Sequence, residues 1–146
     1  MNIEEQVKQM QTIEHTILKF IDEENNAEEF HKNLSNQNFE LQIISNKHKL
    51  KTLLYLLSKI LNNHYRTPNF FTKIEKIFLI YKSEIEKAFT NYEIYKIFEK
   101  SPKFLLFLIK EKIISMNDEI LNEIPTKIFN FLFPKETNQK KLIPEL

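Results

Sequence analysis

The sequence predicts an all-α protein of seven or eight short-to-medium helices, arranged as an antiparallel array of helical hairpins or as an irregular bundle. Three observations support this class. Apolar residues recur at steps of three and four along most of the chain, which is the spacing of one helix face. No run alternates convincingly between apolar and polar residues, as a half-buried strand would. The chain also contains no glycine, and the tight primed turns of β-hairpins are hard to build without it.

The N-terminal part predicts two helices and leaves a third segment open. Apolar residues three and four apart predict a first helix of about five turns; they are Ile3, Val7, Met10, Ile13, Ile17, Leu18 and Ile21. The polar stretch 22–26 ends this helix, and Ala27, Phe30 and Leu34 indicate a shorter second one. The apolar residues of 39–44 could be helical or extended, and their helical neighbours favour a helix.

The middle of the chain predicts two longer helices joined by a short corner. Leucine and isoleucine residues over 50–61 predict the first, which the asparagines 62–63 end. Thr67 and Pro68 are expected to start the next helix, because threonine supplies a capping oxygen and proline already has a helical φ. Apolar residues through Tyr81 cover more than half of this helix, so we expect it to be buried on two sides.

Helix-start signals divide the C-terminal part into further short helices. The signals are the capping-box pair Thr90 and Glu93, the cap-plus-proline pair Ser101 and Pro102, Asn117 or Ser115 as the next cap, and Pro125 as a stop. Apolar residues over 128–133 predict the last helix, which Pro134 closes. Because glycine is absent, we expect asparagine to supply left-handed residues at helix ends.

The length and composition predict one intracellular domain. A chain of 146 residues is long enough for one substantial core, so we expect a single all-helical domain over 1–134 and a polar tail or linker over 135–146. Cysteine is absent, the acidic N-terminus lacks the blocks of a signal peptide, and the longest apolar run, 104–109, is too short to span a membrane. We therefore expect a cytoplasmic protein.

Charge is distributed unevenly along the chain. Residues 1–30 contain two lysines and eight acidic residues, whereas 46–112 contain thirteen lysines and Arg66 against six glutamates. One interpretation is that helical outer faces simply carry these charges. The other is a basic surface for an acidic partner. Nucleic acid is disfavoured as that partner, because only one of the 21 basic residues is arginine, the usual base-reading side chain.

The sequence predicts no catalytic residue, no metal site and no cofactor. Phosphate-binding loops and dinucleotide fingerprints need glycine. The four histidines are His15, His31, His48 and His64, and no two of them have the i, i+3 or i, i+4 spacing of ligands on one helix face. A single Glu-x-x-His, at 28–31, falls short of the two that a di-iron bundle requires.

The corner over 62–77 is the candidate functional site. Part of it is explained by the ends of helices: the asparagines end one helix, and Thr67 and Pro68 start the next. Phe70 and Phe71 would anchor the corner in the core. Four further side chains are not required by the turn, and they are His64, Tyr65, Arg66 and Asn69. Tyrosine and arginine often anchor interfaces, so we predict that these four residues bind a protein partner.

Two blocks of the chain form a distinctive pattern. They are Asn-Asn-His-Tyr-Arg-Thr-Pro-Asn-Phe-Phe at 62–71 and Ser-Pro-Lys-Phe-Leu-Leu-Phe-Leu-Ile-Lys-Glu-Lys-Ile-Ile-Ser at 101–115. With these blocks, and with 47–51 and 131–134, the chain resembles the N-terminal helical region of a large family of ankyrin-repeat proteins from trichomonad-type protists. The resemblance covers nearly the whole chain. It implies an ankyrin-like helical array that leads into repeats and binds partners without chemistry of its own.

One departure from that family concerns the repeats. No Thr-Pro-Leu-His ankyrin signature precedes Leu146, so we expect a lead-in without its repeats, whose final helix pair exposes an apolar face. The leading hypothesis is a non-enzymatic protein–protein interaction module of unknown oligomeric state. One alternative is a Bcl-2-like helical-bundle regulator that binds an amphipathic helix, and another is an unrecognised hydrolase or metal enzyme.

Overall fold

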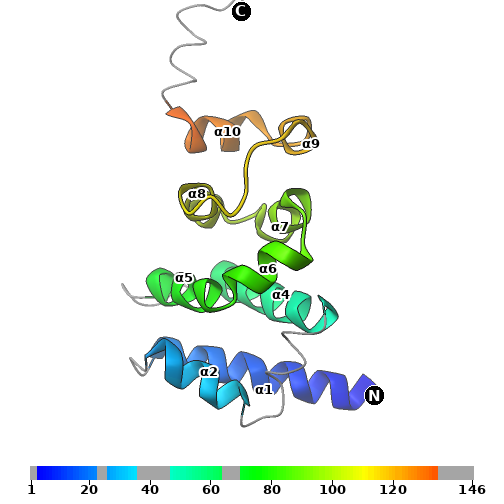
Figure 1. The fold of residues 1–146 in the computed structure, drawn as a ribbon, viewed down its shortest axis with the longest axis vertical. Helices are drawn as coiled ribbons and strands as arrows, with labels where there is room; N and C mark the ends of the chain where they lie inside the picture. The colour runs from blue at the N-terminus through cyan, green and yellow to red at the C-terminus, as the bar shows by residue number, and fades with distance from the viewer. Residues whose placement is uncertain (1–2, 23–25, 36–46, 64–69, 135–146) are drawn as a thin grey trace, which may run out of the picture. The chain divides into compact units, whose positions relative to one another are not determined.

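The predicted all-α class is confirmed in a computed structural model of the chain. The structure describes residues 3–22, 26–35, 47–63 and 70–134, and these ranges contain nine helices and no strand (Figure 1). The count exceeds the prediction because a turn at Tyr81 separates Lys82–Ala88 from the preceding helix. The predicted segment over 39–44, the start at Thr67 and Pro68, and the tail over 135–146 lie outside the described residues.

The chain divides into two compact units, Met1–Phe89 and Thr90–Leu146. Each unit has its own buried apolar residues. The sequence predicts a single domain over 1–134, and this stays a prediction.

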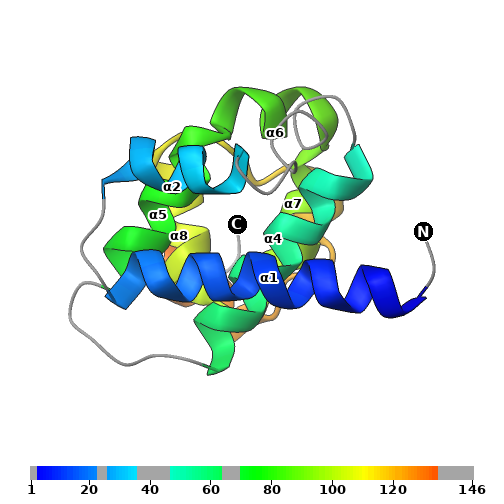
Figure 2. The same cartoon turned by 90° about the horizontal axis from the view of Figure 1, so that it is seen from below.

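Unit 1 is a stack of helix pairs. Its helices are α1 (Ile3–Asp22), α2 (Ala27–Ser35), α4 (Lys47–Asn63), α5 (Phe70–Ile80) and α6 (Lys82–Ala88). The first pair lies on the second: α1 contacts α4 and α5, and α2 contacts α5. Figure 2 shows α1 lying across α4. A hydrogen bond of 3.1 Å between His31 and Tyr81 adds a polar link between α2 and the end of α5.

The predicted apolar stripe of α1 is buried over only half of its length. Its C-terminal half buries Ile13 and Ile17 almost completely, whereas Ile3, Val7 and Met10 are 77%, 46% and 43% exposed. The periodicity therefore identified the apolar face correctly, but α2, α4 and α5 do not cover it at its N-terminal end.

Lys73 of α5 belongs to the core of unit 1 rather than to its surface. The residue is 7% exposed, and its ammonium donates to the backbone oxygens of Phe20 and Ile21 at 2.9 and 2.7 Å. These carbonyls lie in the last turn of α1, where no backbone N–H of the helix can reach them. The same ammonium lies 5.6 Å from the centre of the Phe20 ring. Lys73 thus caps α1 from a neighbouring helix.

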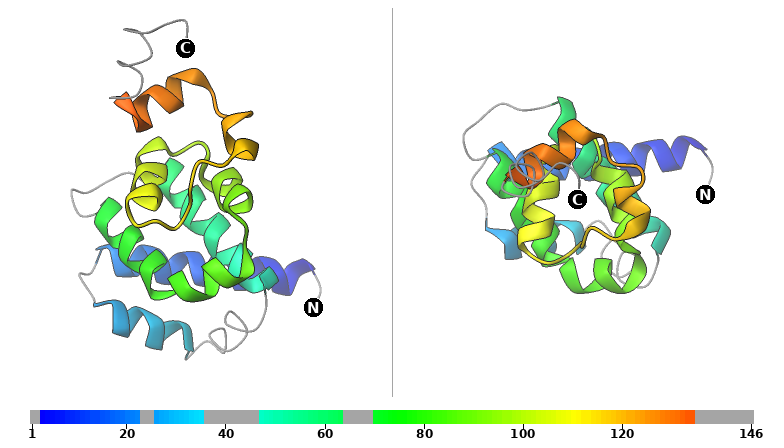
Figure 3. Two further views of the ribbon diagram at one scale, coloured as in Figure 1. Left: turned by 45° about the horizontal axis from the view of Figure 1, so that its top comes forward. Right: turned by 90° about the horizontal axis from the view of Figure 1, so that it is seen from above.

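Unit 2 consists of two short helix pairs that stack on each other. Its helices are α7 (Asn91–Phe98), α8 (Pro102–Lys110), α9 (Asp118–Leu121) and α10 (Thr126–Leu132). Besides the α7–α8 contact, α7 contacts α9 and α8 contacts α10, and Figure 3 shows α10 running beside α8. The core is aromatic: the ring of Phe104 lies 4.7 Å from that of Phe98 and 5.2 Å from that of Phe107.

The helix-start predictions in unit 2 are largely confirmed. Thr90 and Glu93 form the capping box, with the Thr90 hydroxyl accepting from Glu93 N–H and the Glu93 carboxylate accepting from Thr90 N–H. Asn117 caps α9 through a hydrogen bond from Ile120 N–H at 3.0 Å. Ser101 precedes Pro102 as predicted, but its side chain makes no capping hydrogen bond.

The end of α8 corrects the expectation that asparagine supplies left-handed residues. Among the described residues the one positive φ, 59°, belongs to Lys112. The backbone N–H groups of Lys112 and Ile113 donate to Ile109 and Leu108 oxygens, which is the hydrogen-bond pattern of a Schellman motif. Ile113 and Leu108 are both buried, as is usual for the apolar pair of this motif, and the two hydrogen bonds help to hold a lysine in a conformation that glycine usually adopts.

Candidate interaction surface

The four predicted partner-binding residues, His64, Tyr65, Arg66 and Asn69, lie outside the described residues. The structure describes both sides of their corner: α4 ends at Asn63, and α5 begins at Phe70. Phe70 is completely buried and Phe71 is half-buried. The prediction that these phenylalanines anchor the corner in the core is therefore confirmed for Phe70, and the recognition role of the four polar residues stays a prediction.

The surface next to this corner is the outer face of α4. This helix buries eight side chains, and most of its exposed residues lie on one narrow stripe. The α4 ridge, as we name that stripe, consists of His48, Lys51, Tyr55 and Lys59. Steps of three and four place them on one helix face, and each of them is exposed. The tyrosine side chain is the large apolar group of this ridge, at 50% exposure.

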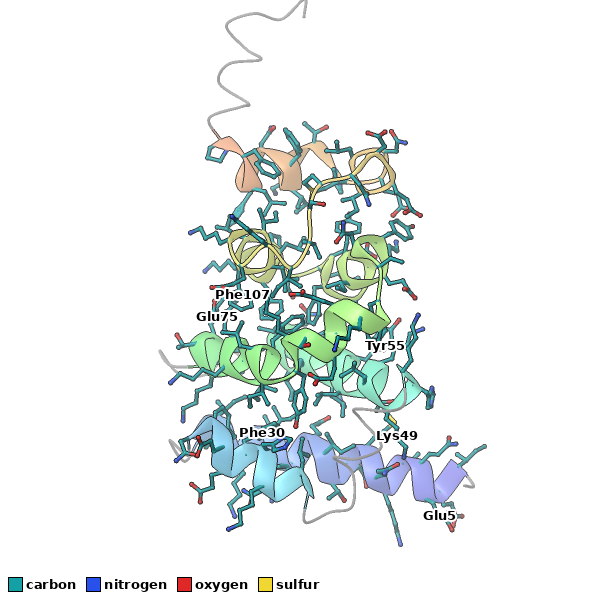
Figure 4. The ribbon with its side chains drawn as sticks, in the orientation of Figure 1. Glu5, Phe30, Lys49, Tyr55, Glu75 and Phe107 are labelled. Atoms are coloured by element: carbon teal, nitrogen blue, oxygen red, sulfur yellow. The ribbon has the colours of Figure 1, made fainter. Side chains whose placement is uncertain are left out.

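Contacts with neighbouring groups hold three of the lysine side chains of α4 in place. The Lys51 ammonium lies 5.7 Å from the centre of the Tyr55 ring, a cation–π arrangement. Lys59 forms an ion pair of 2.9 Å with Glu14 of α1. Lys49, beside the ridge, extends toward α1 and donates to the Gln9 side chain at 2.9 Å (Figure 4). Tyr55 leaves α4 on another side of the helix (Figure 4). The ridge therefore presents one aromatic ring between two positioned cations.

Local electrostatics disfavour the charges at the start of α4. The helix contains four lysines and no acidic residue, and its first turn contains Lys47, His48 and Lys49. The N-terminus of a helix carries a partial positive charge, so lysines there oppose the helix dipole. By contrast, α1, α2, α7 and α9 have acidic residues in their first turns. Contacts within unit 1 offset part of this cost: the Lys47 ammonium lies 5.1 Å from the centre of the Phe89 ring, and Lys49 donates to the Gln9 side chain.

Sequence reasoning missed Tyr55 as a candidate because it lies within a leucine-rich helix. A helical projection could have found it: the leucines occupy most of the circumference, and Tyr55 falls at the middle of the remaining polar stripe. The predicted basic region also needs one correction, since the buried Lys73 contributes no charge to the surface.

Unit 2 has a separate polar cluster that joins α7 to the turn after α9. The Tyr92 hydroxyl donates to one oxygen of Glu123, and the Lys96 ammonium donates to the other at 3.2 Å. Lys96 also donates to Glu99 at 3.2 Å. The bonds from Tyr92 and then Lys96 lower the pKa of Glu123 below its ordinary value of 4.5. Conversely, the bond to Glu123 raises the pKa of Tyr92, and Glu99 and Glu123 raise the pKa of Lys96.

This cluster should make unit 2 less stable in acid. A carboxyl whose pKa is lower in the folded state contributes stability that is fully present above its unfolded pKa, near 4.5, and is lost as the pH falls through the folded pKa. We expect Glu123→Gln to weaken unit 2 at neutral pH and to remove part of this acid sensitivity. Urea unfolding from about pH 3 to 7, followed by circular dichroism, measures both effects.

Glu119→Gln is the matched control, because it removes an exposed carboxylate of α9 that does not bond to Tyr92 or Lys96. Glu119 lies in the first turn of α9, where a carboxylate suits the helix dipole, so this variant should lose some stability but keep the acid sensitivity of the wild type. Identical pH profiles for the wild type and Glu123→Gln would show that the cluster contributes no net stability.

The described residues contain no group of three or more histidine, aspartate or glutamate side chains that could hold a metal ion. His15, His31 and His48 lie on three different helices. The Glu123 carboxylate of the polar cluster is exposed and is bound to one lysine and one phenol. An acid catalyst needs a carboxyl whose pKa is raised by burial, whereas the pKa of Glu123 is lowered. Its contacts are those of a surface ion pair.

No helix among the described residues combines the length and apolar character needed to cross a membrane. Comparison of the chain with family models, with curated proteins and with solved structures finds no match.

Proposed function

We propose that this chain is a non-enzymatic protein–protein interaction module of the cytoplasm. The observation that carries the proposal is the outer face of α4, where an exposed tyrosine lies between Lys51 and Lys59 on a helix that contains four lysines and no acidic residue. The end of α4 leads directly into the corner with His64, Tyr65, Arg66 and Asn69. The contact surface of the module would comprise the α4 ridge and this corner.

The stacking of helix pairs supports a lead-in to ankyrin-type repeats, in line with the resemblance of the sequence. Within unit 2, α7 contacts α9 and α8 contacts α10, as successive hairpins do in repeat proteins whose units touch only their neighbours. Leu121 and Phe131 of the last pair are 42% and 39% exposed. A following repeat would cover such side chains.

The Bcl-2-like alternative receives less support. Such a regulator requires a long apolar helix enclosed by the others around a groove. The longest apolar candidate, α4, keeps its ridge in solvent, and the described helices of each unit pair in layers. We therefore prefer the stacked-hairpin interaction module.

The test is capture of partners by the full chain from extracts of its source cells. We expect the triple variant His64→Ala, Arg66→Ala, Asn69→Ala to recover at least about tenfold less of any partner than the wild type, as the loss of interface anchors does. The matched control is Gln11→Ala, His15→Ala, Lys19→Ala, which removes an amide, an imidazole and a cation from exposed positions of α1.

Circular dichroism of each variant checks that the fold is intact. Equal recovery by the corner variant and the control would assign the corner to structure alone. No specific recovery by the wild-type chain would contradict the interaction module itself.

A further inference from the structure

We propose that the α4 ridge binds an acidic amphipathic helix of a partner protein, with an apolar side chain on Tyr55 and carboxylates at Lys51 and Lys59. The inference rests on the proposed interaction module and adds the chemistry and spacing of its partner. It depends on the geometry of the ridge, on its charge and on one ion pair already present in unit 1.

The geometry sets the spacing of the partner. Lys51 and Lys59 are eight residues apart on one helix, which corresponds to roughly 12 Å along its axis. Tyr55 lies midway between them, with half of its side chain exposed. A partner helix lying along this ridge needs the same spacing. An acidic residue at i, an apolar residue at i+4 and an acidic residue at i+8 would face one lysine, Tyr55 and the other lysine.

The charge of the ridge selects an acidic partner. The two lysines of the ridge, Lys51 and Lys59, are exposed, and α4 contains no acidic residue. Carboxylates of a partner placed along the ridge would therefore meet positive charge on both sides of Tyr55.

The contact between α1 and α4 is an internal example of such recognition. Glu14 projects from one helix onto Lys59 of another at 2.9 Å, and 55% of the Lys59 side chain is still exposed. An ammonium has three N–H donors, so Lys59 can bind a second carboxylate. The lysines carry no planar guanidinium fork, the group best suited to phosphate recognition, and this favours a protein helix over nucleic acid.

The experiment uses the full chain and synthetic helical peptides of about 16 residues, or about four turns. The probe peptide carries Glu, Leu and Glu at i, i+4 and i+8. One comparison peptide replaces the leucine with asparagine, and another replaces both glutamates with glutamine. A single-stranded oligonucleotide of equal net charge tests the nucleic-acid outcome. Fluorescence anisotropy at low and physiological salt measures each affinity.

We expect Tyr55→Ala and Lys51→Glu each to weaken binding of the probe peptide by about tenfold or more. Lys76→Glu, an equal charge change at an exposed position of α5, should weaken it by less than about twofold. Glu14→Gln should strengthen binding because Lys59 loses a competing carboxylate. Glu86→Gln removes an exposed carboxylate near Lys82 and is the control for that gain.

The melting temperature of Lys51→Glu separates recognition from folding. Lys51 is exposed, and exposed substitutions usually change stability little, so this variant should melt close to the wild type while binding is lost. Equal effects of Lys51→Glu and Lys76→Glu, or tighter binding of the oligonucleotide than of the peptide, would overturn the inference. If the peptides fail but cellular capture still depends on the corner, the ridge inference fails and the interaction module stands.

Discussion

Replacing Lys73 with methionine is expected to lower the free energy of unfolding by about 2–3 kcal/mol. The change removes two hydrogen bonds to the Phe20 and Ile21 carbonyls and leaves those carbonyls without their cap. It also removes a cation from the C-terminal end of α1, where the helix dipole favours positive charge. Methionine avoids burying an ammonium, and this relief partly offsets the loss.

The matched control for that experiment is Lys76→Met. Lys76 lies three residues further along α5 and is exposed, so the same change there should alter stability by less than about 0.5 kcal/mol. Urea unfolding of both variants gives the comparison. Equal stability of Lys73→Met and the wild type would mean that the end of α1 does not depend on this lysine.

Lys73 also illustrates which parts of the fold a sequence can predict. The capping box of Thr90 and Glu93 joins residues three apart, and Asn117 caps a residue three positions ahead, so local rules were sufficient for both. Lys73 is bound to carbonyls more than fifty residues away. A lysine is ordinarily a surface residue. The burial of Lys73 is explained only by its contact with the end of α1, which is distant in the sequence.

Periodicity has a similar limit in α1. Val7 and Ile17 follow the same spacing, yet one is 46% exposed and the other is completely buried. A repeat of three and four residues identifies the apolar face of a helix. It does not identify which other elements cover that face, because contacts between distant helices decide it.

The candidate site was predictable only in part. The sequence indicated a basic middle region and a corner rich in polar residues, and the described structure adds the exposed Tyr55 on the outer face of α4. Tyr55 did not stand out, because its exposure depends on where the leucines around it are buried. The cluster at Glu123 was equally hidden, since Tyr92 lies 31 residues before its partner.

Phe104→Ala should produce the largest loss of stability, about 3–5 kcal/mol, the usual range for a buried phenylalanine. Phe104 is completely buried and lies against two other rings in the core of unit 2. Such a loss is a large fraction of the total stability of a small protein. Phe131→Ala, at a position 39% exposed, is the control in the same unit and should cost less than about 1 kcal/mol.

The same variant tests the prediction of one domain over 1–134. A unit the size of Thr90–Leu146 buries too little surface to be more than marginally stable alone, so a single domain is expected to unfold in one transition. Hydrogen exchange of Phe104→Ala should then accelerate in both units by the same free energy, as in one cooperative transition. Faster exchange confined to residues after Thr90, with the amides of α4 and α5 unchanged, would instead show two domains that unfold separately.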